Sequence, residues 1–155
     1  MTALEISQKW SAGRIEALKN NYLKMGLQAS GNWPKQLKDE VTQKGSNINI
    51  SIYGEQYTGA LINGRSRNKN NDKESLRKFA GWAGSTFIAK WVKDKGLNLN
   101  PYAVAYSIGE KGINVPNKYN TGKLISDVIN EKSINDLVNE IGSSILVKFE
   151  INDFK

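Results

Sequence analysis

The stretch of the chain that decides the fold runs over residues 57–113, and it opens with Tyr57-Thr58-Gly59-Ala60-Leu61-Ile62-Asn63-Gly64-Arg65. A strongly basic segment follows, and then comes Phe87-Ile88-Ala89-Lys90-Trp91-Val92-Lys93-Asp94-Lys95-Gly96-Leu97. The stretch closes with Pro101-Tyr102-Ala103-Val104-Ala105-Tyr106-Ser107-Ile108-Gly109-Glu110-Lys111-Gly112-Ile113. The order of its elements points to a kind of protein, whereas the rest of the chain is typical of an ordinary soluble domain.

The first helix predicted inside this stretch covers residues 75–95. Apolar side chains recur there every four residues, which is the spacing of one buried helix face, and a break is expected near Gly81 and Gly84. These two glycines also have the spacing of an RNA-clamping loop, but close helix packing explains them better because their flanks are helical. The side chains expected in the core are Phe79, Ala83, Phe87 and Trp91.

Local signals define the neighbouring segments. Residues 65–73 contain no apolar side chain and are expected to form an exposed loop. Asn100 is expected to cap a second helix that has Pro101 at its first position and ends at Gly112. Residues 56–62 are predicted either to run back as a strand or to begin a helix.

The N-terminal part shows helix and strand patterns in turn. The first thirty residues are predicted to be mostly helical, since apolar residues recur at spacings of three and four. Residues 34–43 are predicted to form a short helix, because two apolar residues lie four apart after a proline. Residues 48–52 alternate isoleucine with polar residues, which predicts a half-buried strand. The apolar face of the first helix comprises Ile15, Leu18, Tyr22 and Met25.

The C-terminal part completes the predicted fold. Residues 124–129 suggest a short helix, and Ser133 with Asp136 three residues later resembles a capping box that starts another. Residues 145–151 alternate apolar and other residues, so we expect a strand that pairs with an earlier one. The chain is predicted to be a single α+β domain over residues 1–155. It has a small antiparallel or mixed β-sheet packed against several amphipathic helices, a long N-terminal helix and an exposed basic loop near 65–74.

Composition excludes several kinds of chemistry. The 155 residues include neither Cys nor His, which excludes thiol nucleophiles, disulfides, zinc bound by these residues and a Ser-His-Asp triad. Acidic pairs such as Asp39-Glu40 lie in polar surroundings and do not have calcium-loop spacing. We therefore expect no enzyme activity, no metal and no cofactor. No signal-peptide pattern and no membrane-spanning run is visible, so a soluble protein is expected.

Charge is spread unevenly along the chain. The formal net charge is +7, but residues 76–123 carry eight Lys/Arg and two Asp/Glu, whereas residues 124–155 carry three Lys/Arg and six Asp/Glu. The basic part can attract nucleic acid, or it can meet the acidic part of another copy; a plain solvated face is the third reading. The candidate contact residues are Arg65, Arg67, Lys69, Lys73, Arg77, Lys78, Asp127, Glu131, Asp136 and Glu140.

Two functional hypotheses follow for the basic segment 65–78. With Trp82 and Phe87 behind it, the segment could grip phosphates and stack bases, which would make the chain a small basic nucleic-acid-binding protein. It can equally be a loop that orders on a protein partner. An inhibitor or toxin-like binding protein is a more remote hypothesis.

The order of motifs in the stretch is similar to that of the neck, or tail-completion, proteins of long-tailed bacteriophages. A strand pair around residues 48–57 is followed by Leu61-Ile62-Asn63-Gly64-Arg65, by Ile88-x-x-Trp91 ending at Lys95-Gly96, and by a helix rich in Ala and Ile ending at Gly112. The resemblance covers roughly residues 45–130.

This resemblance implies a structural virion protein that acts as a head–tail connector. Copies would form a homo-oligomeric ring in the neck, between the portal-side connector and the tail proteins. Genomic DNA would pass through the channel without sequence-specific binding. The protein would be located in the virion, in the host cytoplasm during assembly, and away from membranes.

Overall fold

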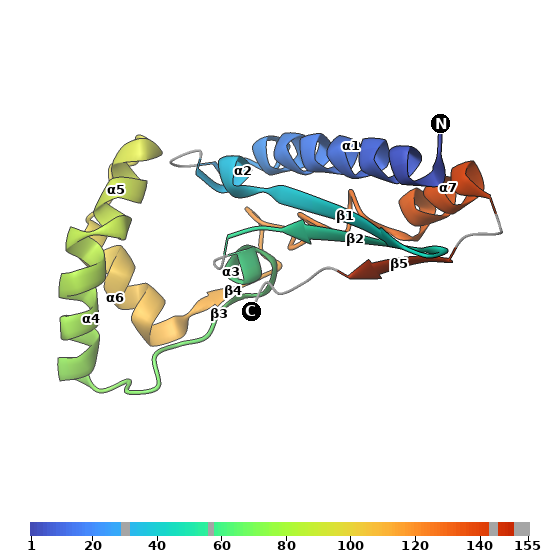
Figure 1. Cartoon of the computed structure of the whole chain (residues 1–155). Coiled ribbons are helices and arrows are strands. Elements are labelled where there is room, and N and C mark those ends of the chain that lie inside the picture. Colours follow the sequence, from blue (N-terminus) through green and yellow to red (C-terminus); the bar gives the residue numbers. More distant parts are fainter. Residues whose placement is uncertain (29–31, 56–57, 143–145, 151–155) are drawn as a thin grey trace.

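The structure of the protein, a computed structural model, describes residues 1–28, 32–55, 58–142 and 146–150. Its helices and strands confirm the predicted α+β class and the long N-terminal helix (Figure 1). Tyr57 and the outer residues of the predicted strand 145–151 lie outside the described residues. The elements are α1 Ala3–Lys24, α2 Asn32–Gln36, β1 Lys38–Lys44, β2 Asn47–Tyr53, α3 Thr58–Asn63, β3 Gly64–Arg65, α4 Lys73–Ser85, α5 Phe87–Asp94, α6 Pro101–Lys111, β4 Ile113–Asn114, α7 Glu131–Ile141 and β5 Leu146–Glu150.

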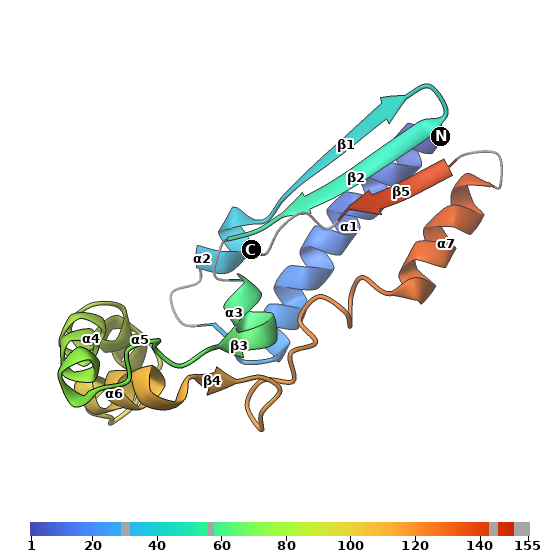
Figure 2. The same cartoon turned by 90° about the horizontal axis from the view of Figure 1, so that it is seen from below.

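The larger sheet is mixed and has the strand order β1-β2-β5. β1 pairs antiparallel with β2, and β2 pairs parallel with β5, so the predicted C-terminal strand does join an earlier strand. Ile48 and Ile50 of β2 are buried against Leu137 of α7, and α1 runs along the same side of the sheet (Figures 1 and 2). Between these isoleucines Asn49 is exposed, so the sheet has one face covered by helices and one polar face.

The helix predicted over residues 34–43 is wrong, because α2 ends at Gln36 and β1 occupies Lys38–Lys44. All seven residues of β1 are paired with β2 through a tight turn at Gly45, whose φ of +62° suits glycine. Pairing with a strongly patterned strand thus overrides a weak helical spacing of two residues. Of the two alternatives for residues 56–62, the helix is right for the described part, since α3 begins at Thr58.

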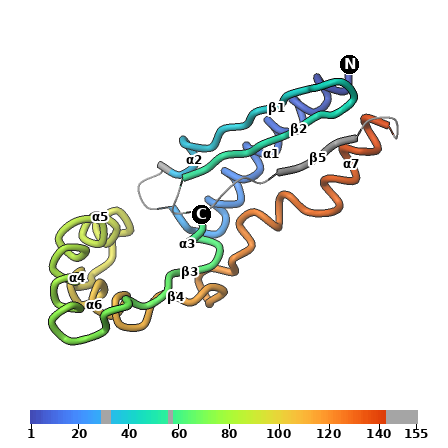
Figure 3. The backbone as a smooth tube through the Cα atoms, turned by 60° about the horizontal axis from the view of Figure 1, so that its bottom comes forward, coloured from blue at the N-terminus to red at the C-terminus, as the bar shows by residue number. Residues whose placement is uncertain are grey.

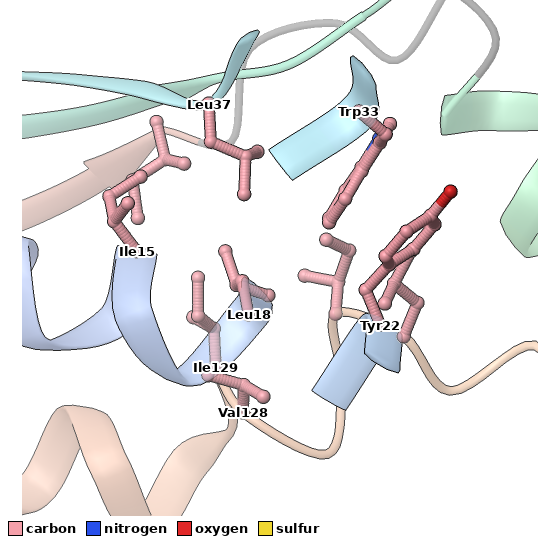
Figure 4. Packing of buried hydrophobic residues seen from close by; sticks show 10 residues of the cluster. Ile15, Leu18, Tyr22, Trp33, Leu37, Val128 and Ile129 are labelled. Atoms are coloured by element: carbon pink, nitrogen blue, oxygen red, sulfur yellow. The ribbon is translucent and has the colours of Figure 1, made fainter. Parts of the chain in front are cut away.

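The main core lies between α1, α2 and the turn at residues 124–129 (Figure 4). The predicted α1 face is confirmed: Ile15, Leu18 and Tyr22 are buried, while Met25 packs against the core from a partly buried position. The Tyr22 ring stacks on Trp33, with ring centroids 4.8 Å apart. Burial raises the pKa of the Tyr22 hydroxyl. This cluster holds the N-terminal helix to the rest of the body.

The C-terminal elements differ from their predicted forms. Residues 124–129 form a hydrogen-bonded turn rather than a helix, with the Ile129 N–H donating to the Ile125 carbonyl at 2.8 Å, although their apolar side chains are buried as the spacing predicts. Ser133 is not the N-cap of α7. The N-cap of α7 is Asn130, and Ser133 is the third residue of the helix. The side chains of Asn130 and Ser133 each accept a hydrogen bond from the backbone N–H of the other residue, at 3.0 Å in both cases.

Replacement of Thr58 by Val tests how the core satisfies its polar groups. The Trp33 indole N–H donates to the Thr58 hydroxyl at 2.7 Å, and that hydroxyl donates to the Glu55 carbonyl at 2.5 Å. Thr58→Val leaves the buried indole N–H without this acceptor, so urea unfolding should show a loss of about 1–3 kcal/mol. Thr42→Val, the same change at an exposed position of β1, is the control. Equal effects of the two changes would contradict this account.

Candidate functional site

The helices α4, α5 and α6 form a separate three-helix unit (residues 73–111). Within the described residues, their main contacts are with one another, and Figures 1 and 2 show the unit standing away from the sheet. The chain leaves the body through β3 and returns through β4, which lie side by side (Figure 3). A hydrogen bond from the Lys95 ammonium to the Gly26 carbonyl, at 2.5 Å, joins the unit to the body near the end of α1.

Two glycines allow the strands of this β3–β4 ribbon to approach closely. Gly64 and Gly112 have φ values of +78° and +73°, in the left-handed region that favours glycine. A Cβ atom on Gly64 would run into the carbonyl oxygen of Ile113, and one on Gly112 would run into the carbonyl oxygen of Arg65. Each glycine therefore makes room for the backbone of the opposite strand.

Arg65, a predicted contact residue, is half-buried and holds the ribbon to the three-helix unit. Its guanidinium lies 4.8 Å from the centroid of the Phe79 ring and donates to the Asn68 side-chain oxygen at 2.8 Å and to the Ile108 carbonyl at 3.4 Å. The Asn68 N–H donates to the Gly109 carbonyl at 2.8 Å. These contacts give Arg65 a structural role within its own chain.

Small residues bring α4 and α6 close together. Ala80, Ala83 and Gly84 are buried on α4, and Ala105 and Gly109 are buried on α6. A Cβ atom on Gly84 would lie 2.9 Å from Cα of Tyr102, as close packing predicts for this glycine. Gly81, by contrast, is exposed and has no such neighbour within 4 Å. The Gly81–Gly84 motif is helical and therefore does not form a clamping loop.

The prediction that aromatic side chains of this segment lie in the core is wrong for Phe87 and Trp91, which are 50% and 36% exposed, whereas Phe79 packs against the core of the unit from a partly buried position. Trp82 is 61% exposed. The buried residues of α4 are Leu76, Ala80, Ala83 and Gly84, and the helix breaks at Thr86, two residues after Gly84 and close to the expected place. This break turns α5 so that its buried residues are Ile88 and Val92.

Exposed Trp82 and Phe87 form a continuous surface with partly buried Phe79, here called the aromatic ridge (Phe79, Trp82 and Phe87). The Phe79 and Trp82 centroids are 6.1 Å apart, and Trp82 and Phe87 meet edge to face at 5.4 Å. Trp91 follows Phe87 one helical turn later. The lysines next to the ridge have carboxylate partners, since Lys78 pairs with Glu74 at 2.8 Å and Lys90 with Asp94 at 2.6 Å. The ridge is therefore apolar, and the Arg65 guanidinium over the Phe79 ring places one positive charge beside it.

The other predicted basic residues are exposed on the 66–72 loop and the start of α4: Arg67, Lys69, Lys73, Arg77 and Lys78. The exposed loop is thus confirmed apart from half-buried Arg65 and Asn68. Asp72 caps α4, and hydrogen bonds from Ser75, followed by that from the Glu74 N–H, hold the pKa of its carboxyl below the ordinary value. Arg77 borders the α4–α6 groove, a shallow groove of about 520 Å³ lined by Arg77, Ala80, Gly81, Tyr102, Ala103 and Tyr106.

The predicted acidic residues are also exposed, but they lie elsewhere. Glu131, Asp136 and Glu140 are on α7, and Asp127 shortly precedes it. Figures 1 and 2 place α7 and the three-helix unit at opposite ends of an elongated molecule. The structure therefore does not bring the basic and acidic candidates together within one chain, and their contact between copies stays a prediction.

The described part of the chain presents two candidate binding surfaces, the aromatic ridge and the α4–α6 groove. No group of three or more acidic side chains gathers there to hold a metal ion, and no helix in it has the length and apolarity to span a membrane. Comparison with models of protein families, with curated proteins and with solved structures finds no match. The candidate site is thus the three-helix unit with its aromatic ridge and groove.

Replacement of Gly64 by Ala tests the ribbon. The new methyl group meets the Ile113 carbonyl, so Gly64→Ala should lower the free energy of unfolding by about 2 kcal/mol more than Gly45→Ala does. Gly45 is a matched control, because it has a similar φ of +62° with nothing within 4 Å of the added atom. Chemical denaturation of both variants measures the difference. If both lose the same stability, the close approach of the two strands is wrong.

Proposed function

We propose that this chain is a structural protein of a tailed bacteriophage, and that copies of it form a ring in the neck between portal and tail. Such a ring lines the channel through which the genome leaves. The proposal rests on the resemblance of residues 45–130 to neck proteins. The observation that carries it further is an elongated subunit with a basic unit at one end and an acidic helix at the other.

The charges of the two ends support a polar ring. The three-helix unit carries seven Lys/Arg and three Asp/Glu, whereas residues 127–141 carry four Asp/Glu and one lysine. Elongated subunits set side by side around an axis give a ring with two chemically different faces. One face suits a portal-side partner and the other a tail-side partner. The net charge of +7 also favours nonspecific passage of DNA over repulsion.

Electron microscopy tests this proposal directly. We expect the purified chain, alone or with portal-side and tail proteins, to form rings with a central channel, and antibodies to it should label the neck of purified particles. A chain that is absent from purified particles would remove the proposed role. Rings that fail to bind either set of partners would remove the connector function while leaving self-assembly intact.

Nucleic-acid binding is the second candidate, and the exposure of Trp82 one helical turn after Lys78 favours it. Nucleic-acid binding would show an affinity that falls steeply as the salt concentration rises. The slope of log affinity against log salt should become smaller by about one for each phosphate contact that a mutation removes. A neck protein should bind DNA weakly and without sequence preference, and Trp82→Gln should leave that binding unchanged. Tight binding that is lost in Trp82→Gln and in Arg67→Ala, but kept in Lys9→Ala on α1, would favour this candidate over the ring.

A further inference from the structure

We propose that the aromatic ridge of one copy docks into the α4–α6 groove of the next copy, so that the three-helix units join head to tail around the ring. The proposal rests on the ring assembly proposed above and names the surfaces that make it. The occupant of the groove is a second copy of this chain, because the chain itself carries both halves of the fit.

The ridge and the groove lie on opposite flanks of α4. Successive residues of a helix turn by about 100°, so Phe79 and Trp82 project on one side of the buried stripe of Ala80 and Ala83, whereas Arg77 and Gly81 project on the other. The two flanks are accessible because the unit stands away from the body on the β3–β4 ribbon (Figures 1 and 2). A surface and its complement on opposite sides of one unit make a heterologous contact, which is the kind that closes rings.

The groove suits an aromatic side chain. Apart from Arg77 it is lined by Ala80, Gly81, Ala103 and the two tyrosines at positions 102 and 106, which together offer a mostly apolar surface to a ring. Arg77 at the border can lie over the face of the incoming ring. Trp82 is the ring that the ridge presents furthest, at 61% exposure. Tryptophan and arginine are the residue types that most often carry the binding energy of an interface.

Salt dependence separates a protein occupant from a nucleic acid at the ridge. Two lysines of the unit, Lys78 and Lys90, have carboxylate partners at 2.8 Å and 2.6 Å, whereas the Arg65 guanidinium over the Phe79 ring bonds to the uncharged groups of Asn68 and Ile108. The units themselves are positively charged as a whole. Added salt screens the repulsion between two such units, so this docking should strengthen as salt rises. A contact between basic and acidic ends, or with nucleic acid, should weaken instead.

A pair of complementary variants tests the proposal. Trp82→Gln removes the ring from the ridge and keeps a good helix former. Ala103→Glu fills the groove and pairs with Arg77; since Asn100 is the N-cap, it also places Glu at the third helical position, where it supports the helix. Tyr119→Gln, which removes an exposed ring outside the unit, is the control. Circular dichroism verifies that each variant is folded.

Sedimentation and light scattering give the outcome. Wild type and Tyr119→Gln should form assemblies larger than dimers that grow with concentration and salt, whereas either docking variant alone should self-associate at least about thirtyfold more weakly. Mixed in equal amounts, the two variants should form a heterodimer and stop there, because one intact ridge meets one intact groove. Monomeric wild type, unaltered assembly of the variants, or a mixture that stays monomeric would each overturn the proposal.

Failure of this docking contact can be distinguished from failure of the proposed neck role. If the docking variants still assemble into rings on particles, the neck role stands and this contact is wrong. If the mixed variants form the heterodimer but the chain is absent from particles, the contact stands and the neck role is wrong.

Discussion

The close approach of two backbones in the β3–β4 ribbon is the constraint on which the rest of the structure depends. Gly64 faces the Ile113 carbonyl and Gly112 faces the Arg65 carbonyl, so neither position has room for a side chain. This narrow ribbon carries residues 73–111 out of the body and back. Arg65, stacked on Phe79, then fixes the ribbon to the unit that it carries. A peripheral helical unit with two accessible flanks is the consequence.

Small residues control the chemistry of that unit in the same way. Gly84 lets the backbone of α4 approach Tyr102 of α6, and Gly109 of α6 leaves space for the side chains of Leu76 and Phe79 of α4. Trp82 and Phe87 lie outside this contact and meet each other. The unit therefore presents an apolar ridge on a surface that is otherwise basic. Such a surface on a small projecting unit is typical of a protein contact.

The sequence predicts those features whose cause is local. The α1 face, the alternation in β2 and the Asn100 cap follow from spacing and backbone chemistry within a few residues. Prediction from the sequence fails where a segment distant in the chain decides which structure forms. Residues 38–44 become a strand because β2 pairs with them, and Trp82 is exposed because α6 packs against the alanines beside it. The recurrence of small residues four apart, as in Ala80 and Gly84 or Ala105 and Gly109, is the signal that could have revealed this packing.

The projecting three-helix unit is thus the part of the fold that we propose contacts neighbouring copies. The chain contains no cysteine, so Trp82→Cys and Ala103→Cys introduce unique reactive positions on the ridge and in the groove. Treatment of the double variant with a short bismaleimide measures their proximity between copies. The account predicts a ladder of cross-linked dimers, trimers and longer species, with little product from either single variant. Absence of the ladder, or equal dimer formation by Trp82→Cys alone, would contradict it.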